Sequence, residues 1–242
     1  MPRAVLFDVD GTLVDSVALH AAAWQEAFAR FGKRVSLEEV RRQIGKGGDQ
    51  LVPVFLTEDE QRRFGRALQD FRSELYVREY LPRVRPFPGA RELVERVRAA
   101  GAAAVLASSA RGEELEKMVR LLGIEHAVEA KTSADDAERS KPSPDIFRAA
   151  LARAGGVAPA DAIALGDTPW DAIAAGRAGV RTIGVLAGGF DEAELLAAGC
   201  IAIYRDARDL LARYDGSPLG TGGSPASART TSTAPRPSAG GS

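Results

Sequence analysis

Short apolar segments alternate with longer segments of helical character along most of this chain. The apolar segments predict strands at residues 4–9, 102–107, 162–166, 182–186 and 200–204, with the last at an edge of the sheet. Helices are predicted between them, at residues 90–100, 112–122, 144–154, 169–178 and 192–198. Strands that are apolar at every position are typical of a parallel sheet covered on both faces. The pattern therefore predicts an α/β fold with a doubly wound, Rossmann-like parallel sheet.

One interval, from about residue 15 to residue 81, lacks this alternation and contains only predicted helices. Ser36 with Glu39, and Thr57 with Glu60, each match a capping box, in which two side chains satisfy free N–H groups where a helix begins. An all-helical block inserted directly after the first strand predicts an α-helical cap subdomain.

We therefore expect a core domain formed by residues 1–14 and 82–214 and a helical cap domain formed by residues 15–81. The last segment, 215–242, consists almost entirely of Gly, Ser, Thr, Pro and Ala, and Leu219 is its only large aliphatic side chain. Such a segment cannot bury enough apolar surface to offset the entropy lost on ordering. It is predicted to be a disordered tail with no catalytic role.

The composition excludes several classes of protein. The 242 residues are 45% hydrophobic, and 32 basic side chains nearly balance 33 acidic ones. A protein that binds nucleic acid or an anionic membrane through bulk charge would carry a clear basic excess. No apolar run is long enough to span a bilayer, and the single cysteine, Cys200, cannot form an internal disulfide. We expect a cytoplasmic protein, monomeric or homodimeric, with no nucleic-acid or membrane partner.

Polar side chains follow the predicted strands at their carboxyl ends, where doubly wound sheets bind ligands. They are Asp8 and Asp10 at the end of the first strand, Ser108 and Ser109 after the second, Asp167 and Asp171 after the third, and Lys141 in a nearby loop. Crowded carboxylates repel one another unless a cation lies between them, and a set of oxygen ligands suits Mg²⁺. A lysine and hydroxyls at the same edge favour an anion with several oxygens, such as a phosphoryl group.

A carboxylate nucleophile beside a metal ion and a phosphate predicts phosphoryl transfer through an aspartyl-phosphate. This reaction also needs a general acid that protonates the leaving alkoxide and later takes a proton from water. Asp10, two residues after Asp8, is placed to fill that role.

Four motifs resemble those of the haloacid dehalogenase superfamily, and they occur in that family's order. Residues 8–16 (DVDGTLVDS) are similar to the first motif and residues 106–109 (LASS) to the second. Residues 141–145 (KPSPD) resemble the third motif and residues 166–171 (GDTPWD) the fourth. The helical block after the first motif resembles the small cap of the phosphoglycolate phosphatase and β-phosphoglucomutase branches. The resemblance implies a Rossmann-like core with an α-helical cap that closes over the substrate.

The resemblance also implies a role for each matching residue. Asp8 would be the nucleophile and a ligand of Mg²⁺. Asp10 would be the general acid/base, with its backbone carbonyl on the metal. Ser108 and Lys141 would bind the phosphate together with backbone N–H groups, and Ser109 is included in the same phosphate-binding segment.

The remaining candidates have weaker signals. Asp167 would be a further Mg²⁺ ligand, whereas Asp171 would support the metal site from outside it or only stabilise the start of its own helix. His20 would either pack on the apolar stripe of its helix or, as the resemblance implies, face the active site. Lys46 precedes two glycines in a predicted cap loop, where it could reach a distal group of the substrate or remain in solvent.

The leading interpretation is a Mg²⁺-dependent phosphatase that hydrolyses a small phosphorylated metabolite, similar to phosphoglycolate or a sugar phosphate. The alternative is a β-phosphoglucomutase-like phosphomutase. His20 favours the phosphomutase. However, Asp49 occupies the position at which similar mutases carry a basic residue that binds the second phosphate. A dehalogenase is disfavoured by Asp10, because that branch usually lacks the second acid. A non-catalytic regulatory protein with this fold is disfavoured by the intact acids and Lys141.

Overall fold

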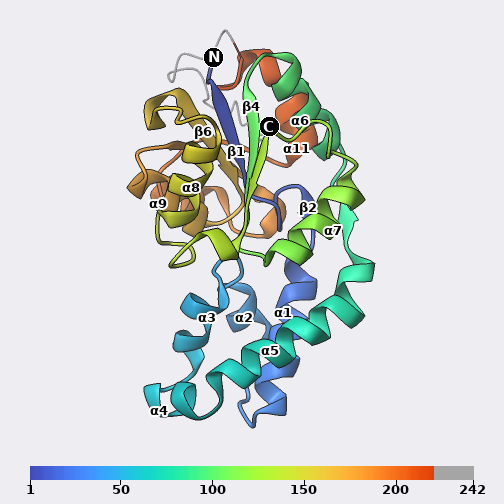
Figure 1. Ribbon diagram of the computed structural model, residues 1–242, viewed down its shortest axis with the longest axis vertical. Helices are drawn as coiled ribbons and strands as arrows, with labels where there is room; N and C mark the ends of the chain where they lie inside the picture. Colours follow the sequence, from blue (N-terminus) through green and yellow to red (C-terminus); the bar gives the residue numbers. More distant parts are fainter. Residues whose placement is uncertain (221–242) are drawn as a thin grey trace, which may run out of the picture.

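In the computed structural model, which describes residues 1–220, six parallel strands form one central sheet in the order β5-β4-β1-β6-β7-β8. These strands are β1 Ala4–Phe7, β4 Ala103–Ala107, β5 Ala130–Thr132, β6 Ala162–Gly166, β7 Arg181–Val185 and β8 Cys200–Tyr204. Figure 1 shows the sheet in the upper part of the molecule, with α8 and α9 on one side and α6 and α11 on the other. The predicted α/β fold with a parallel sheet is confirmed.

The sheet is covered on both faces because its strands are apolar at every position. Successive side chains of a strand point to opposite faces, so Ala4 and Leu6 of β1 pack in one apolar cluster and Val5 and Phe7 in another. The first face is covered by α8 Asp145–Arg153 and α9 Pro169–Arg177, and the second by α6 Ala90–Ala99, α7 Gly112–Leu122 and α11 Ala207–Ala212. A short helix, α10 Glu192–Ala197, packs near the edge strand β8.

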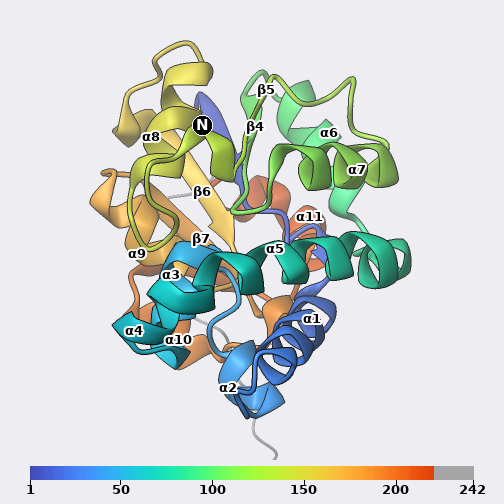
Figure 2. The ribbon, with the colours of Figure 1, turned by 60° about the horizontal axis from the view of Figure 1, so that its bottom comes forward.

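A block of helices lies below the sheet in Figure 1 and in front of it in Figure 2. It contains α1 Val17–Arg30, α2 Leu37–Arg41, α3 Gly48–Phe55, α4 Glu58–Glu60 and α5 Arg66–Leu75, with π-helical turns at Gln61–Gly65 and Tyr76–Tyr80 and a 3₁₀ turn at Leu81–Arg83. Trp24, Phe28, Leu51 and Leu68 belong to an apolar cluster of its own. Both predicted capping boxes are present, at the starts of α2 and α4. Hereafter this block is called the cap.

The chain passes between sheet and cap through two short antiparallel strands, β2 Val14–Asp15 and β3 Arg85–Pro86. The pair is continued by a hydrogen bond from the N–H of Phe87 to the carbonyl of Leu13, at 2.9 Å. The sequence analysis predicted only helices from about residue 15 to residue 81, so the strand at Asp15 is a difference at the boundary. A two-residue strand has too little pattern to be recognised.

Three other elements differ from the predictions. Strand β5 was missed because it is only three residues long and contains Lys131. Helix α8 begins at Asp145 with Pro144 as its N-cap, so the predicted start at residue 144 is one residue too early. The start of the predicted disordered tail is also corrected, because Ser217 and Leu219 are fully buried. Leu219 belongs to the main apolar cluster, which offsets the ordering of these residues.

The rest of the predicted tail, 221–242, lies outside the described residues. Within residues 1–220, no helix has the length and apolar character that a membrane span requires.

Candidate active site

The sheet topology brings three chain segments together at the carboxyl end of β1. Phe7 of β1 pairs with Leu106 of β4 on one side and with Leu165 of β6 on the other. The residues that follow these strands therefore meet at one edge of the sheet, and the N–H of Asp8 donates to the carbonyl of Leu165 at 2.8 Å. Asp8 is the first residue beyond β1, and its side chain is buried.

Lys141 is a fully buried ammonium surrounded by oxygen atoms. Its Nζ lies 2.5 Å from Oδ1 of Asp8 and 2.7 Å from Oδ1 of Asp171, and it donates to the carbonyl of Ala107 at 2.9 Å. Burial would lower the pKa of Lys141, but the two carboxylates outweigh burial and raise it. The side chain is therefore a permanent positive charge next to the carboxylate of Asp8.

Asp8, Asp167 and Asp171 form a buried acidic cluster in which one ligand oxygen from each lies within 4.8 Å of the others. Burial, acting first, and repulsion from neighbouring carboxylates raise the pKa of Asp8 to about 7. The same two causes raise the pKa of Asp167 well above its ordinary value. One ammonium, that of Lys141, does not compensate three carboxylates, so the site favours binding of an additional cation.

The donor set fits a hard cation such as Mg²⁺. Thr12 donates to Oδ1 of Asp167 at 2.9 Å, whereas Oδ2 of Asp167 is buried without a partner among residues 1–220. A Cβ added at Gly11 or Gly188 would lie 2.3 Å or 1.7 Å from that oxygen, so both glycines leave room around it. Carboxylate oxygens with open space between them are the ligands that Mg²⁺ prefers in proteins.

Asp171 differs from Asp167 because both of its oxygens are engaged, one in hydrogen bonds and the other in an ion pair. Oδ2 accepts hydrogen bonds from the N–H of Thr168 at 3.1 Å and from its hydroxyl at 2.5 Å, and Oδ1 faces Lys141. With the bond from its own N–H to the Thr168 hydroxyl, this forms the capping box of α9. Asp171 thus stabilises its helix and also holds the lysine that contacts Asp8.

Asp10 is held by residues of the cap side. Its Oδ1 accepts from the hydroxyl of Ser16 at 2.6 Å and lies 2.8 Å from Nε2 of His20. Burial would raise the pKa of Asp10, but His20, Ser16 and Arg72 together lower it. The ring of His20 stacks on that of Tyr76, with 4.0 Å between the ring centroids. His20 therefore packs against its neighbours and also contacts the active site.

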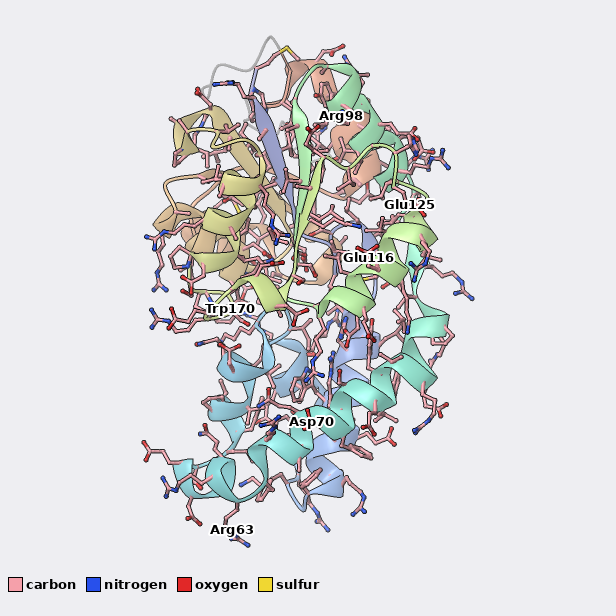
Figure 3. All side chains as sticks on the ribbon, viewed as in Figure 1. Arg63, Asp70, Arg98, Glu116, Glu125 and Trp170 are labelled. Carbon is pink, nitrogen blue, oxygen red and sulfur yellow. The ribbon has the colours of Figure 1, made fainter. Side chains whose placement is uncertain are left out.

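A cavity of about 290 Å³ lies between the sheet edge and the cap. Asp8, Asp10 and Ser109 line it from the sheet side, and His20 and Lys46 line it from the cap. Lys46 donates to Gln43 at 2.6 Å, and its Nζ lies 3.9 Å from the centre of the Trp170 ring. Figure 3 shows Trp170 at the lower edge of the sheet, directly above the cap.

The two serines of the second motif are placed differently. Ser108 is fully buried, and its hydroxyl accepts from the N–H of Ala110 at 3.1 Å, which shapes the turn after β4. Ser109 lines the cavity and donates to the carbonyl of Gly45, in the cap, at 3.2 Å. Ser109 therefore links the sheet edge to the cap through this hydrogen bond.

Three residues of the site were missed or undervalued by the sequence analysis. Thr12 lies within the first motif but was given no role of its own, whereas its hydroxyl contacts both Asp167 and Asp8. Arg72 donates to Nδ1 of His20 across 52 positions of the chain, and Glu114 lines the cavity from α7. No local pattern marks Arg72 or Glu114, because only the packing of the cap on the sheet brings them to the cavity.

Comparison with known proteins agrees with this geometry. The family described as haloacid dehalogenase-like hydrolase matches residues 5–185 of the chain. The chain belongs to this family. Within it, this haloacid dehalogenase-like hydrolase falls in the phosphoglycolate phosphatase and β-phosphoglucomutase-like subfamily.

Two relatives and one solved structure illustrate the similarity of this hydrolase to others. It is 27% identical to a phosphorylated carbohydrates phosphatase of Thermotoga maritima, over 84% of this chain and 94% of that protein. It is 29% identical to a phosphoglycolate phosphatase of Neisseria gonorrhoeae, over 77% of this chain and 80% of that protein. The crystal structure of a hydrolase from Pseudomonas syringae superimposes with a TM-score of 0.79 at 29% identity, covering 88% of this chain and 97% of that one.

Proposed function

We propose that this protein is a Mg²⁺-dependent phosphatase that hydrolyses a small phosphorylated metabolite through an aspartyl-phosphate on Asp8. The observation that carries the proposal is the contact of 2.5 Å between Asp8 and Lys141 within a buried acidic cluster at the cavity. The lysine offsets the repulsion between Asp8 and an incoming phosphate, which lets one anion approach another. The relatives named above, which act on phosphorylated carbohydrates and on phosphoglycolate, support a small phosphate ester as substrate.

Asp8 and Asp167 would hold the metal ion with their side chains, and Asp10 would do so with its backbone carbonyl. When bound, Mg²⁺ supplies positive charge that neutralises the carboxylates and the phosphoryl oxygens. Thr12 fixes one oxygen of Asp167, which leaves the other oxygen directed at the site. Asp171 is engaged with Thr168 and Lys141, so it supports the site without being a required ligand.

In the first half of the proposed reaction, a carboxylate oxygen of Asp8 attacks phosphorus. The bond between phosphorus and the ester oxygen breaks, and the leaving alkoxide takes a proton from Asp10. Lys141 and the N–H groups of the turn after β4 stabilise the phosphoryl oxygens while charge builds up on them. Ser108 maintains the shape of that turn through its bond to Ala110.

In the second half, Asp10 takes a proton from water, and the resulting hydroxide attacks phosphorus. The bond between phosphorus and the Asp8 oxygen breaks, which releases inorganic phosphate and regenerates the carboxylate. Asp10 starts the first half protonated, and it returns to that form when it takes the proton from water. Between the two steps it is a carboxylate, a form that Ser16 and His20 favour because both donate to its Oδ1 and lower its pKa. This is the form needed to accept a proton, and Oδ2, which has no hydrogen-bond partner among residues 1–220, is the oxygen available for it.

We further propose that residues 15–81 act as a cap domain that closes over the substrate and excludes bulk water. In addition to Ser109 and Gly45, the N–H of Ser140 donates to Asp49 of the cap at 3.1 Å. Arg42 of the cap pairs with Glu194 near the edge of the sheet. Such polar contacts can break and re-form as the cap opens, because they are partly exposed and little apolar surface is lost with them.

Replacement of the nucleophile tests the proposal. Asp8→Asn should abolish release of inorganic phosphate from p-nitrophenyl phosphate and from a panel of phosphorylated metabolites, while circular dichroism shows a folded chain. Asp15→Asn is the matched control, because Asp15 lies in the same motif but is exposed, and its activity should be unchanged. EDTA should remove the wild-type activity and Mg²⁺ restore it. An Asp8→Asn variant that still hydrolyses these phosphate esters would contradict the proposal.

The phosphomutase remains the second candidate because His20 contacts Asp10 at 2.8 Å, which places it at the active site. Assay of β-glucose 1-phosphate separates the two activities: a mutase yields the isomeric sugar phosphate, whereas the proposed phosphatase yields free phosphate. Asp49 is exposed and bound to the Ser140 N–H, and its negative charge would repel a second phosphate at that position. We therefore expect free phosphate as the main product.

A further inference from the structure

Glu114 is a buried carboxylate in the cavity wall that the proposed reaction does not use. It lies in the first turn of α7, lines the cavity together with Asp8 and Asp10, and is only 3% exposed. Its Oε1 accepts a hydrogen bond from the hydroxyl of Ser73, in α5 of the cap, at 3.1 Å. A carboxylate this deeply buried ordinarily has a cationic partner.

Among residues 1–220, however, no basic side chain forms an ion pair with Glu114, and its Oε2 has no hydrogen-bond donor. Its position in the first turn of α7 suits a carboxylate, because the start of a helix carries partial positive charge. Glu114 therefore presents a carboxylate oxygen as an acceptor to whatever group of the substrate lies beside it.

The basic side chains in the cavity lining are held by other residues, and none of them forms an ion pair with Glu114. Arg72 is bonded to His20, Lys46 to Gln43, and Arg111 to Asp70 at 3.4 Å. Figure 3 labels Asp70 on α5, in the cap. The Nε of Arg72 is buried without a hydrogen-bond partner among residues 1–220, and so is closed to a ligand.

We propose that Glu114, oriented by Ser73, is a specificity-determining residue that selects phosphate esters whose leaving group carries hydroxyls and rejects those that carry a carboxylate. A substrate hydroxyl would donate to Oε2 and satisfy its free acceptor capacity. A substrate carboxylate would instead face the Glu114 carboxylate across the cavity, where two like charges repel each other. The inference rests on the proposed function and narrows its substrates to sugar or polyol phosphates.

Matched pairs of esters test this specificity, because each pair differs only in one terminal group. Glycerol 3-phosphate is compared with 3-phosphoglycerate, and glucitol 6-phosphate with 6-phosphogluconate, under saturating Mg²⁺. For the wild-type protein we expect kcat/KM for the hydroxyl member of the preferred pair to exceed that for the carboxylate member by about tenfold or more, since juxtaposed like charges disfavour the wrong ligand. A third pair, O-phosphoethanolamine and 2-hydroxyethyl phosphate, compares kcat/KM for an ester with an ammonium group and for one with a hydroxyl.

The variant Glu114→Gln keeps the shape of the side chain and removes its charge. The kcat/KM for the carboxylate ester should therefore rise, and the ratio of kcat/KM for the hydroxyl ester to that for the carboxylate ester should fall to about threefold or less. The control is Glu113→Gln, because Glu113 is the exposed neighbour on the same helix and should leave the ratio unchanged. Thermal unfolding verifies that both variants are folded. If Glu114→Gln does not fold, the ratio of kcat/KM values measured for the wild-type protein tests the inference by itself.

A wild-type preference for the carboxylate members, equal rates within each pair, or a ratio that Glu114→Gln leaves unchanged would overturn the inference. A preference for the ammonium ester over its hydroxyl counterpart would overturn the assignment to hydroxyls. These outcomes differ from failure of the proposed function, which would appear as no Mg²⁺-dependent turnover of any phosphate ester.

Discussion

Arg72 donates a hydrogen bond to Nδ1 of His20, and His20 in turn contacts Asp10 through Nε2 at 2.8 Å. Because Nδ1 is an acceptor in this pair, the proton of the neutral ring lies on Nε2, from which it is donated to the carboxylate. An arginine of the cap thereby sets the hydrogen-bonding state of the proposed general acid/base in the core. Proton transfer and cap position are linked through these three side chains.

Loss of this link should slow the reaction without loss of fold. Arg72→Met removes the donor to Nδ1, so the ring of His20 can turn or change tautomer and Asp10 loses a fixed partner. We expect kcat to fall about tenfold or more, with a smaller change in KM, because positioned acid–base groups contribute two orders of magnitude or more. The acidic limb of the pH profile of kcat should move to higher pH, since His20 helps to lower the pKa of Asp10.

The control for this variant is Arg66→Met, because Arg66 is on the same helix with a side chain that is 97% exposed. It should leave kcat and its pH profile unchanged. An Arg72→Met protein with the wild-type profile would show that the arginine only fills space.

Binding of Mg²⁺ should stabilise the fold more at high pH than at low pH. The pKa of Asp8 is about 7 in the folded chain without metal, against 3.8 for the free group. The stability that this group contributes is therefore fully present below the unfolded value and is lost as pH rises through about 7. Asp167 acts in the same direction.

Mg²⁺ binds the ionised carboxylates, so it should recover that stability at pH values above about 7 and have little effect near pH 5. At a concentration about a hundredfold above Kd, the free energy of unfolding should rise by about 2.7 kcal/mol. Thermal unfolding with Mg²⁺ or EDTA at the two pH values measures the difference. If Mg²⁺ raised the unfolding temperature equally at both pH values, the result would argue against titration of Asp8 and Asp167 in this range.

A methyl group at Gly188 should damage the metal site specifically. The added Cβ would lie 1.7 Å from Oδ2 of Asp167, so that carboxylate must move from the position in which its free oxygen faces the site. We expect Gly188→Ala to raise the Mg²⁺ concentration needed for half-maximal activity by about tenfold or more, since loss of the residues that support metal ligands lowers metal affinity 10- to 100-fold. Titration of activity with Mg²⁺ measures this.

Gly176→Ala provides the comparison, because a Cβ at that helical position meets nothing within 4 Å. It should keep the Mg²⁺ titration of the wild type and raise the free energy of unfolding by about 0.5–1 kcal/mol. Equal Mg²⁺ titrations for the two variants would contradict the role given to Gly188.

Removal of the buried lysine should affect stability and activity together. Lys141→Met leaves Asp8 and Asp171 without their cationic partner, and breaking a buried ion pair from one side costs about 3–5 kcal/mol. Urea unfolding without metal should show this loss. Mg²⁺ should recover part of the stability, but turnover should remain absent, because the ammonium that offsets the charge of the incoming phosphate is gone.

The sequence by itself predicted the parallel sheet, because apolar residues at every strand position have to be covered on both faces. It also predicted that Asp8, Asp167 and Lys141 carry the chemistry, since each lies in one of the four motifs. The cap helices were recognisable from two capping boxes, which are local hydrogen-bonding patterns over four residues. Features of this kind depend on neighbours along the chain, so they can be read without coordinates.

Only the tertiary structure showed which side chains of the cap reach the cavity. Arg72 lies 52 positions from His20, and Ser73 lies 41 positions from Glu114, so no spacing in the sequence connects the members of either pair. Leu219 was likewise placed in the tail by its local composition, whereas it is buried in the main apolar cluster. Contacts between distant segments arise from the packing of one element on another, and that packing is decided by the whole chain.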